Sequence, residues 1–94
     1  MKKLEITNVE FAAASPEEVE LGLLGWVSFD LGNFRVDGCT LRRSATGMHL
    51  LSFPARKDVN GKQHFYFCPR NNISRAQIEH QVFRALNLER RAPR

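Results

Sequence analysis

The residues of this chain that could act on a partner are mostly arginines and lysines, and they are unevenly placed. Residues 1–40 hold three basic groups against seven acidic ones, a net charge of −4. Residues 41–94 hold eleven basic groups against three acidic ones, a net charge of +8. Such a split indicates a polyanionic partner. The alternative is a solvated basic surface that only keeps the protein dissolved.

The basic residues of the second half gather before a predicted turn, around a predicted hairpin tip and along a predicted closing helix. In that order they are Arg42 and Arg43; Arg56, Lys57 and Lys62; and Arg70, Arg75 and Arg84, with Arg90, Arg91 and Arg94 beyond. Arginine outnumbers lysine nine to two over residues 41–94, and its guanidinium can hold a phosphate through two parallel hydrogen bonds. The amides that open the helix, over residues 74–77, could hold another. The first eight of these side chains are candidates for nucleic-acid binding.

Catalytic and metal-binding patterns are missing from the sequence. No serine lies in a nucleophile elbow, and neither GxGxxG nor GxxxxGK[ST] occurs. Histidines 49, 64 and 80 and cysteines 39 and 68 lack the spacing of zinc ligands. We therefore expect no enzyme, no cofactor, no metal site and no disulfide.

The elements that must position the basic residues are predicted to be strands joined by short loops. At 94 residues with 43% hydrophobic content, the chain predicts one folded domain over residues 1–94, with residues 91–94 as a frayed basic tail. A first strand should change face near Asn8. Apolar residues at every second position from Val19 to Leu31 predict a long second strand, bent at Gly22 and Gly25 and preceded by a turn, or one helical turn, over residues 15–18.

Three further strands follow in the prediction. The third begins after a tight turn at residues 32–33 and carries a bulge at Gly38. A turn over residues 45–47 leads to a strand over residues 48–53 that Pro54 ends. Asn60-Gly61 predicts a type I′ hairpin, because both of its central residues need positive φ. The returning strand covers residues 63–68, so the expected fold is α+β: one antiparallel, meander-like five-stranded sheet followed by a helix.

The closing helix carries the clearest helical pattern of the chain. Ser74 is the expected N-cap, completed as a capping box by Gln77. An apolar stripe should face the sheet: Ile78, Val82, Ala85 and Leu86, with Phe83 on its flank. The polar faces should hold Arg75, Glu79, His80, Arg84 and Asn87.

Three aromatic residues, Phe65, Tyr66 and Phe67, lie between the basic clusters. The favoured interpretation puts Phe65 and Phe67 in the core and leaves Tyr66 half-buried. An exposed Tyr66 that stacks a base is the alternative.

The segment FPARKDVNGK, with what surrounds it, resembles the SpoVG family of bacterial septation and sporulation regulators. The matching features are a strand–turn–strand with Asp30 and Phe34, a strand ending in Pro54 with the basic pair Arg56 and Lys57, a glycine-containing turn, a strand ending near Pro69, and a helix opening with Ser74-Arg75. They span roughly residues 6–86. The CPRNN connection, Trp26, Cys39 and the short basic tail depart from the family pattern.

The resemblance implies a five-stranded sheet with a helix, a homodimer, and binding to DNA or RNA as a regulator. By position it carries over only Arg56, Lys57 and Arg75. The remaining candidates, Arg42, Arg43, Lys62, Arg70 and Arg84, rest on charge alone. The acidic first half is the expected side for a dimer contact.

The rival hypothesis is a non-enzymatic protein-interaction module that uses a sheet edge or the face of Trp26. No apolar run approaches the length of a membrane span, and MKKLEIT lacks the apolar stretch of a signal peptide. We therefore expect a cytoplasmic protein without a membrane partner.

Overall fold

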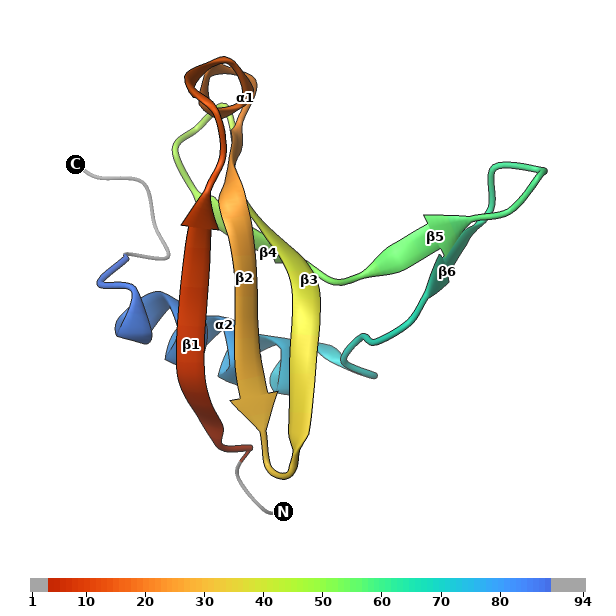
Figure 1. Ribbon diagram of the computed structural model, residues 1–94. Helices are drawn as coiled ribbons and strands as arrows, with labels where there is room; N and C mark the ends of the chain where they lie inside the picture. Colours follow the sequence, from red (N-terminus) through yellow and green to blue (C-terminus); the bar gives the residue numbers. More distant parts are fainter. Residues whose placement is uncertain (1–3, 89–94) are drawn as a thin grey trace.

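The structure, a computed structural model, describes residues 4–88 and confirms the α+β class (Figure 1). Four antiparallel strands form the main sheet in the order β1-β2-β3-β4, and a separate two-stranded sheet holds β5 and β6. In chain order the elements are β1 (Ile6–Ala13), α1 (Pro16–Glu20), β2 (Leu23–Leu31), β3 (Phe34–Arg43), β4 (His49–Ser52), β5 (Ala55–Lys57), β6 (Gln63–Phe65) and α2 (Asn72–Ala85).

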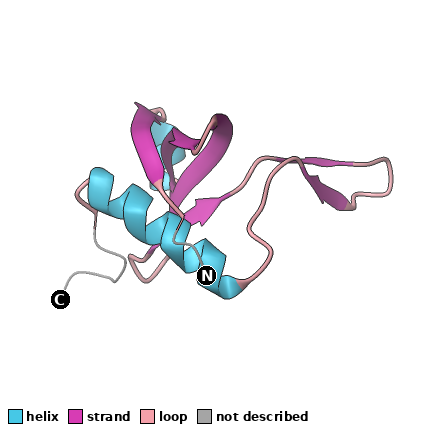
Figure 2. Ribbon diagram, turned by 90° about the horizontal axis from the view of Figure 1, so that it is seen from below, coloured by secondary structure: helices cyan, strands magenta, loops and turns pink. Residues whose placement is uncertain are grey.

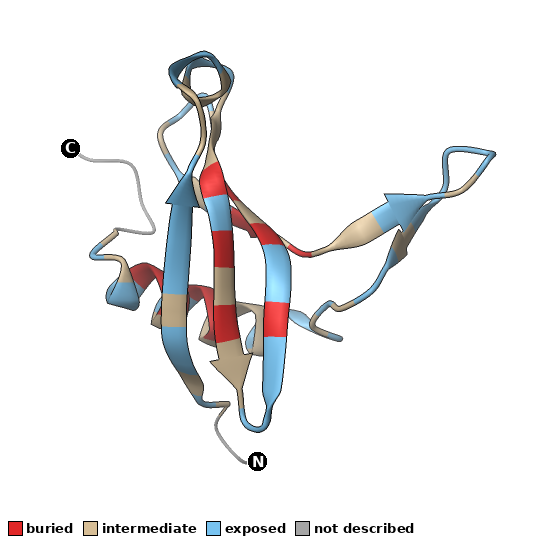
Figure 3. Cartoon of the chain, in the orientation of Figure 1, coloured by how far each residue is buried: buried red, intermediate tan, exposed pale blue. Residues whose placement is uncertain are grey.

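Helix α2 covers one face of the main sheet, and the core lies between them (Figures 2 and 3). The buried apolar side chains are Val27, Phe29, Val36, Cys39, Leu41, Leu51, Phe53, Ile78, Val82 and Phe83. The predicted helical stripe is therefore confirmed at Ile78, Val82 and Phe83, whereas Ala85 is exposed. Among residues 4–88 no helix covers the opposite face of the sheet (Figure 2).

The prediction of one five-stranded sheet is wrong. The chain leaves the main sheet after Ser52, and β5 and β6 pair only with each other. Pro54 lies at this exit, where a proline cannot donate a ladder hydrogen bond. The last strand is also shorter than predicted, since β6 ends at Phe65 rather than at Cys68.

The second strand begins later than its alternating pattern predicts. Ser15 forms a full capping box with Glu18, and the helical alternative for this segment is confirmed as α1. Val19 therefore lies in a helix, and Leu21 is 85% exposed. Gly22 then turns the chain at φ +100° into β2, a conformation that glycine adopts without strain.

The predicted irregularities of the sheet are confirmed. Asn8 has φ 50°, and the β1–β2 register shifts between Thr7 and Glu10. The β2–β3 register shifts once beside Gly25 and once opposite Gly38. At Gly25 a side chain cannot be added, because a Cβ would lie 2.3 Å from the Ala12 carbonyl oxygen.

The hairpin at Asn60-Gly61 exists, but its turn is not type I′. Gly61 has φ 82°, whereas Asn60 is not among the residues of positive φ. The loop over residues 58–62 is closed by Asp58, whose carboxylate accepts hydrogen bonds from the Asn60 and Lys62 amides at 2.9 and 3.0 Å. An aspartate that caps its own turn stabilises this wider connection in place of the two-residue one.

The closing helix begins three residues earlier than predicted. Asn71, not Ser74, is the N-cap, and its side-chain oxygen accepts from the Ser74 amide at 2.8 Å. Glu79, predicted on a polar face, is 7% exposed. Its carboxylate accepts from the Leu51 amide at 3.4 Å and lies 3.7 Å from Arg75. The sequence missed this placement because the partners of Glu79 on β4 are distant along the chain.

Candidate nucleic-acid interface

Strands β5 and β6 form an arm that projects from the body of the molecule (Figures 1 and 2). We call residues 55–65 the hairpin arm. At its base the Tyr66 amide donates to the Pro54 carbonyl at 2.9 Å. Just beyond, the Phe67 ring packs against Phe29 and Phe53, with ring centroids 6.5 and 5.9 Å apart. A two-stranded hairpin has little stability of its own, so this packing fixes how the arm leaves the core.

The hairpin arm carries basic side chains on both of its faces and at its tip. Arg56 is opposite His64 on one face, and Lys57 is opposite Gln63 on the other. Lys62 lies in the tip loop, and all three basic residues are exposed. None of them forms an ion pair within residues 4–88. The arm is therefore a protruding cationic element.

The one acidic residue of the arm, Asp58, makes its contacts within the arm. Asp58 Oδ2 lies 2.8 Å from His64 Nε2. The His64 contact and the Lys62 and Asn60 amides lower the pKa of Asp58 below its ordinary value. Asp58 therefore stays ionised and holds the tip together, but within residues 4–88 it forms no ion pair with Arg56, Lys57 or Lys62.

A polar groove of about 380 Å³ separates the base of the arm from the uncovered face of the main sheet. We call it the outer groove. Thr40 and Arg42 line it from β3, Ser52 from β4, and Gln63 and Tyr66 from the arm side. Because Lys57 is paired with Gln63, it shares the face of the arm that borders this groove. The structure thus brings Arg42 of the first basic cluster close to the second cluster.

Tyr66 stands at the junction of arm and body and is 71% exposed, while Phe65 is 50% exposed. The favoured prediction of a core Phe65 and a half-buried Tyr66 is therefore wrong. The cause is the separation of the arm, because no other element covers its aromatic side chains. Phe67 alone of the three packs against the core.

The uncovered sheet face continues from the outer groove to Trp26. Thr40 is paired with Trp26 on one side and with Ser52 on the other, so the three side chains form one row. Trp26 is 40% exposed, on the face opposite Val27 and Phe29 as predicted. Thr40, Ser52 and Gln63 were not identified from the sequence. The alternation of β3 could have found Thr40, because it places Thr40 on the same uncovered face as Arg42.

At the end of the uncovered face that lies next to the β2–β3 turn, side chains of β1, β2 and β3 form an ion-pair network. Arg35 contacts Glu10, lies 3.0 Å from Asp30 and donates to the Asn8 carbonyl and the Ser28 hydroxyl at 3.0 Å. Hydrogen bonds from Asn8 and Arg35 lower the pKa of Asp30. Glu10 and Asp30 pair with Arg35 and together outweigh its charge. This end of the sheet is therefore acidic, in contrast to the basic arm.

Arg75 is engaged within the fold. Its guanidinium donates to the Leu51 carbonyl at 2.8 Å, lies 3.7 Å from Glu79 and sits 5.4 Å above the Phe53 ring. These contacts join the first turns of α2 to β4. They occupy several of the guanidinium N–H groups that a phosphate would need.

Replacing Arg75 with alanine is expected to cost about 2 kcal/mol of folding free energy, since a part-buried hydrogen bond to the Leu51 carbonyl, a cation–π contact and an ion-pair contact of the buried Glu79 are lost. Urea unfolding measures that loss. Nucleic-acid affinity should stay within about twofold of the wild type, because the other basic contacts remain. A large fall in affinity with unchanged stability would instead show that Arg75 contacts the nucleic acid.

The other predicted basic residues are spread over the surface. Arg43 follows the alternation of buried Leu41 and therefore points away from the face of Arg42. Arg70 is in the connection from β6 to α2. Arg84 borders a hollow with His80, Phe83 and Leu88 at the far end of α2 from the arm. The structure places Arg42 beside the arm face that carries Lys57, while Arg56 lies on the other face of the arm and Lys62 in its tip loop. Arg43 and Arg84 point or lie away from the outer groove.

Side chains that could bind a metal ion do not cluster in the described part of the chain. Within residues 4–88 no group of three or more histidine, cysteine or acidic side chains could hold a metal ion. Cys39 is buried, and that burial raises the pKa of its thiol to about 12; Cys68 is exposed, and both cysteines are free. None of the helices over these residues has the length and apolar character needed to cross a membrane.

Comparisons with known proteins leave the family open. No family model matches the chain, and no curated protein sequence matches it significantly. The resemblance to the SpoVG family therefore stays a prediction.

Proposed function

We propose that this chain binds the backbone of DNA or RNA through the hairpin arm and the outer groove, as a cytoplasmic regulator of the SpoVG type. The observation that carries the proposal is the arm itself. It presents Arg56, Lys57 and Lys62, which form no ion pair within residues 4–88, on an element that projects from the core. Projecting cationic hairpins can reach phosphates that a flat surface cannot.

The groove beside the arm supplies groups of the kind that contact nucleotides. Arg42 can pair with a second phosphate, and the Thr40 and Ser52 hydroxyls and the Gln63 amide can hydrogen-bond to sugar or phosphate oxygens. The exposed ring of Tyr66 at one end and the indole of Trp26 at the other offer surfaces on which bases can stack. A single strand lying along this face would meet charge and aromatic surface together.

A titration with DNA and RNA oligomers at two salt concentrations tests the proposal. Trp26 is the only tryptophan, and its position beside the groove makes its fluorescence the readout. We expect quenching that saturates at low salt and binding that weakens steeply at high salt, because much of the affinity comes from released counterions. The proposal fails if neither nucleic acid produces a fluorescence or mobility change at low salt.

Tyr66→Ala is expected to weaken binding to single strands by about tenfold, the effect of losing one stacked base. Binding to a duplex, whose bases are paired and stacked, should change little. Tyr66→Phe is the matched control and should retain wild-type affinity, since the ring is kept. Equal losses for single and double strands would exclude stacking at this position.

A protein-interaction module is the second candidate function, and the exposure of Trp26 on the uncovered sheet face favours it. Such a face could receive a partner protein without help from the arm. Wild-type chain that purifies free of nucleic acid at low salt and shifts with neither DNA nor RNA would favour this candidate over the first.

A further inference from the structure

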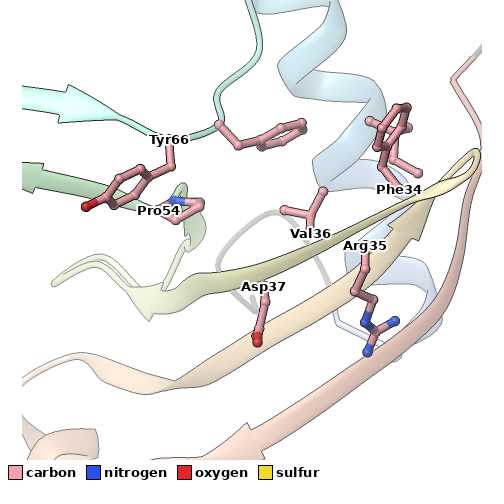
Figure 4. A pocket seen from close by; sticks show the side chains of 8 residues that line it. Phe34, Arg35, Val36, Asp37, Pro54 and Tyr66 are labelled. Atoms are coloured by element: carbon pink, nitrogen blue, oxygen red, sulfur yellow. The ribbon is translucent and has the colours of Figure 1, made fainter.

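A second cavity lies at the base of the hairpin arm, beside the outer edge of β3. Its volume is about 580 Å³, within the range of roughly 300–1,000 Å³ that is typical of small-ligand pockets. Phe34 and Val36 border it from β3, and Pro54 and Tyr66 border it from the arm side. We call it the edge hollow. Figure 4 shows the Tyr66 and Phe34 rings at its two ends.

The two end rings of the edge hollow are largely free of the core. Phe34 is 75% exposed and Tyr66 is 71% exposed. The ring of Phe67, which also borders the hollow, packs against Phe29 and Phe53 and so ties one wall to the core. Exposed aromatic rings on a fixed wall offer surfaces on which the bases of a single strand can stack.

The open edge of β3 adds polar groups to these apolar walls. Within residues 4–88 no strand pairs with this edge over residues 34–38, because the β3–β4 ladder begins at Thr40. Leu31 and Phe34 are paired across a two-residue turn, and the closing pair of such a hairpin bonds inward. By alternation, the amide and the carbonyl of Arg35 point outward.

Arg35 and Asp37 border the edge hollow through their backbone. Figure 4 shows that both side chains point to the opposite side of β3, where the Arg35 guanidinium pairs with Glu10 and Asp30. The backbone of Arg35 therefore presents a donor and an acceptor next to each other at the hollow. An unpaired base carries donors and acceptors side by side on its edges, and proteins that bind single strands bond to those edges.

Arg56 supplies a positive charge on the same side of the arm. The Tyr66 amide donates to the Pro54 carbonyl, so these two residues are opposite each other at the base of the arm. Arg56 follows Pro54 by two residues, about 7 Å along an extended strand, and by alternation projects to the same side. It is exposed and forms no ion pair within residues 4–88. The mouth of the hollow therefore favours an anionic occupant over a neutral peptide strand.

We infer that the edge hollow binds one unpaired base of a single-stranded nucleic acid. The base contacts the Phe34 and Tyr66 rings and bonds to the Arg35 backbone, while Arg56 contacts a neighbouring phosphate. This inference rests on the proposed function and deepens it, because a base that is paired in a duplex cannot enter the hollow. The arm then uses both faces, with Lys57 toward the outer groove and Arg56 toward the edge hollow.

Fluorescence-anisotropy titrations of the full chain with labelled single-stranded DNA and RNA oligomers test the inference. Phe34→Ala should weaken single-strand binding about tenfold, the effect of one lost stacking contact, and duplex binding less than about twofold. Phe34→Tyr keeps a ring and should bind as the wild type does. Phe11→Ala, the matched control, removes a partly exposed ring from β1 at the other edge of the sheet and should leave the affinity unchanged. Undiminished single-strand binding by folded Phe34→Ala overturns the inference.

A strand made of abasic nucleotides separates base binding from any other effect of the substitution. The wild type and Phe34→Ala should bind this strand equally, because it has no base to enter the hollow. If Phe34→Ala loses as much affinity for the abasic strand as for the intact one, the ring acts through the shape of the protein, and the inference is wrong.

Photocrosslinking tests the same contact in the wild-type chain, so it does not depend on the folding of a variant. An oligomer that carries 5-iodouracil forms adducts with aromatic side chains that lie against the base. Peptide mapping should find an adduct on Phe34 as well as on Tyr66. Adducts confined to Trp26, or to Trp26 and Tyr66, contradict a base in the edge hollow.

The remaining outcomes separate the inference from the proposed function. If the wild type binds single strands with a steep salt dependence and Phe34→Ala binds them equally well, only the inference fails. If the wild type binds no strand at low salt, the proposed function fails with it. Light scattering covers another occupant: a wild-type dimer that Phe34→Ala converts to monomers would show that a second copy fills the hollow, and would refute base binding there.

Discussion

Reversing both charges of the basic pair on the hairpin arm, as Arg56→Glu with Lys57→Glu, is expected to lower nucleic-acid affinity by about 100-fold at low salt. Two charge-assisted contacts to phosphate are lost, and each contributes roughly 1.5 kcal/mol. The loss should be similar for many sequences, because backbone contacts carry no sequence information. The slope of log affinity against log salt should also flatten by about 1.5 to 2, the share of two phosphate contacts.

A matched variant separates location from total charge. Arg43→Glu with Arg84→Glu changes the net charge equally, but both positions lie away from the outer groove. Mobility-shift titrations of the two variants should give a much smaller loss for this control. Equal losses would mean that the overall charge, not the arm, attracts the nucleic acid.

Replacing Phe67 with alanine is expected to cost about 2 to 3 kcal/mol of folding free energy, the lower end for a large aromatic side chain because Phe67 is only partly buried. The ring fills the space between Phe29 and Phe53 at the point where the chain returns from the arm. Its removal leaves a cavity there and frees the direction of the arm.

Urea unfolding measures the cost, and Phe65→Ala is the control. Phe65 belongs to the same aromatic run but is half-exposed on the arm, so its loss should cost less than about 1 kcal/mol. Amide exchange in β6 should speed up in Phe67→Ala alone. If the two variants are equally stable, Phe67 does not fix the arm to the core.

The order of most strands and turns and of the closing helix could be predicted, because each is signalled by residues that lie close together in the sequence. The turns at residues 32–33 and 45–47, the change of face at Asn8 and the bulge at Gly38 each depend on one or two residues with special backbone preferences. The apolar stripe of α2 is likewise a property of one segment. These features were predicted correctly although the packing partners of each element were unknown.

The errors came from features that depend on distant partners. The sequence suggested that the segment after Pro54 continues the sheet, yet whether a strand joins a sheet depends on a free edge elsewhere. Alternation from Val19 to Leu31 predicted a strand that begins at Val19, whereas Val19 lies in the helical turn that the capping box of Ser15 and Glu18 stabilises.

The candidate site shows the same division. The Asn60-Gly61 signal placed Arg56, Lys57 and Lys62 correctly on a hairpin. The sequence could not reveal that Arg42 lies beside the Lys57 face of that hairpin, or that Arg75 is held by Leu51 and Glu79. Those relations come from strand pairing and helix docking. The outer groove exists only because the arm turns away from the sheet.

Nuclear magnetic resonance mapping of amide shifts during titration with a short single-stranded oligonucleotide tests the central claim most directly. Binding by the arm predicts that the largest changes occur in residues 55–66, at Thr40 to Arg42 and at the Trp26 indole. Changes confined to β1, α1 or α2 at saturation, with the arm unmoved, would contradict it.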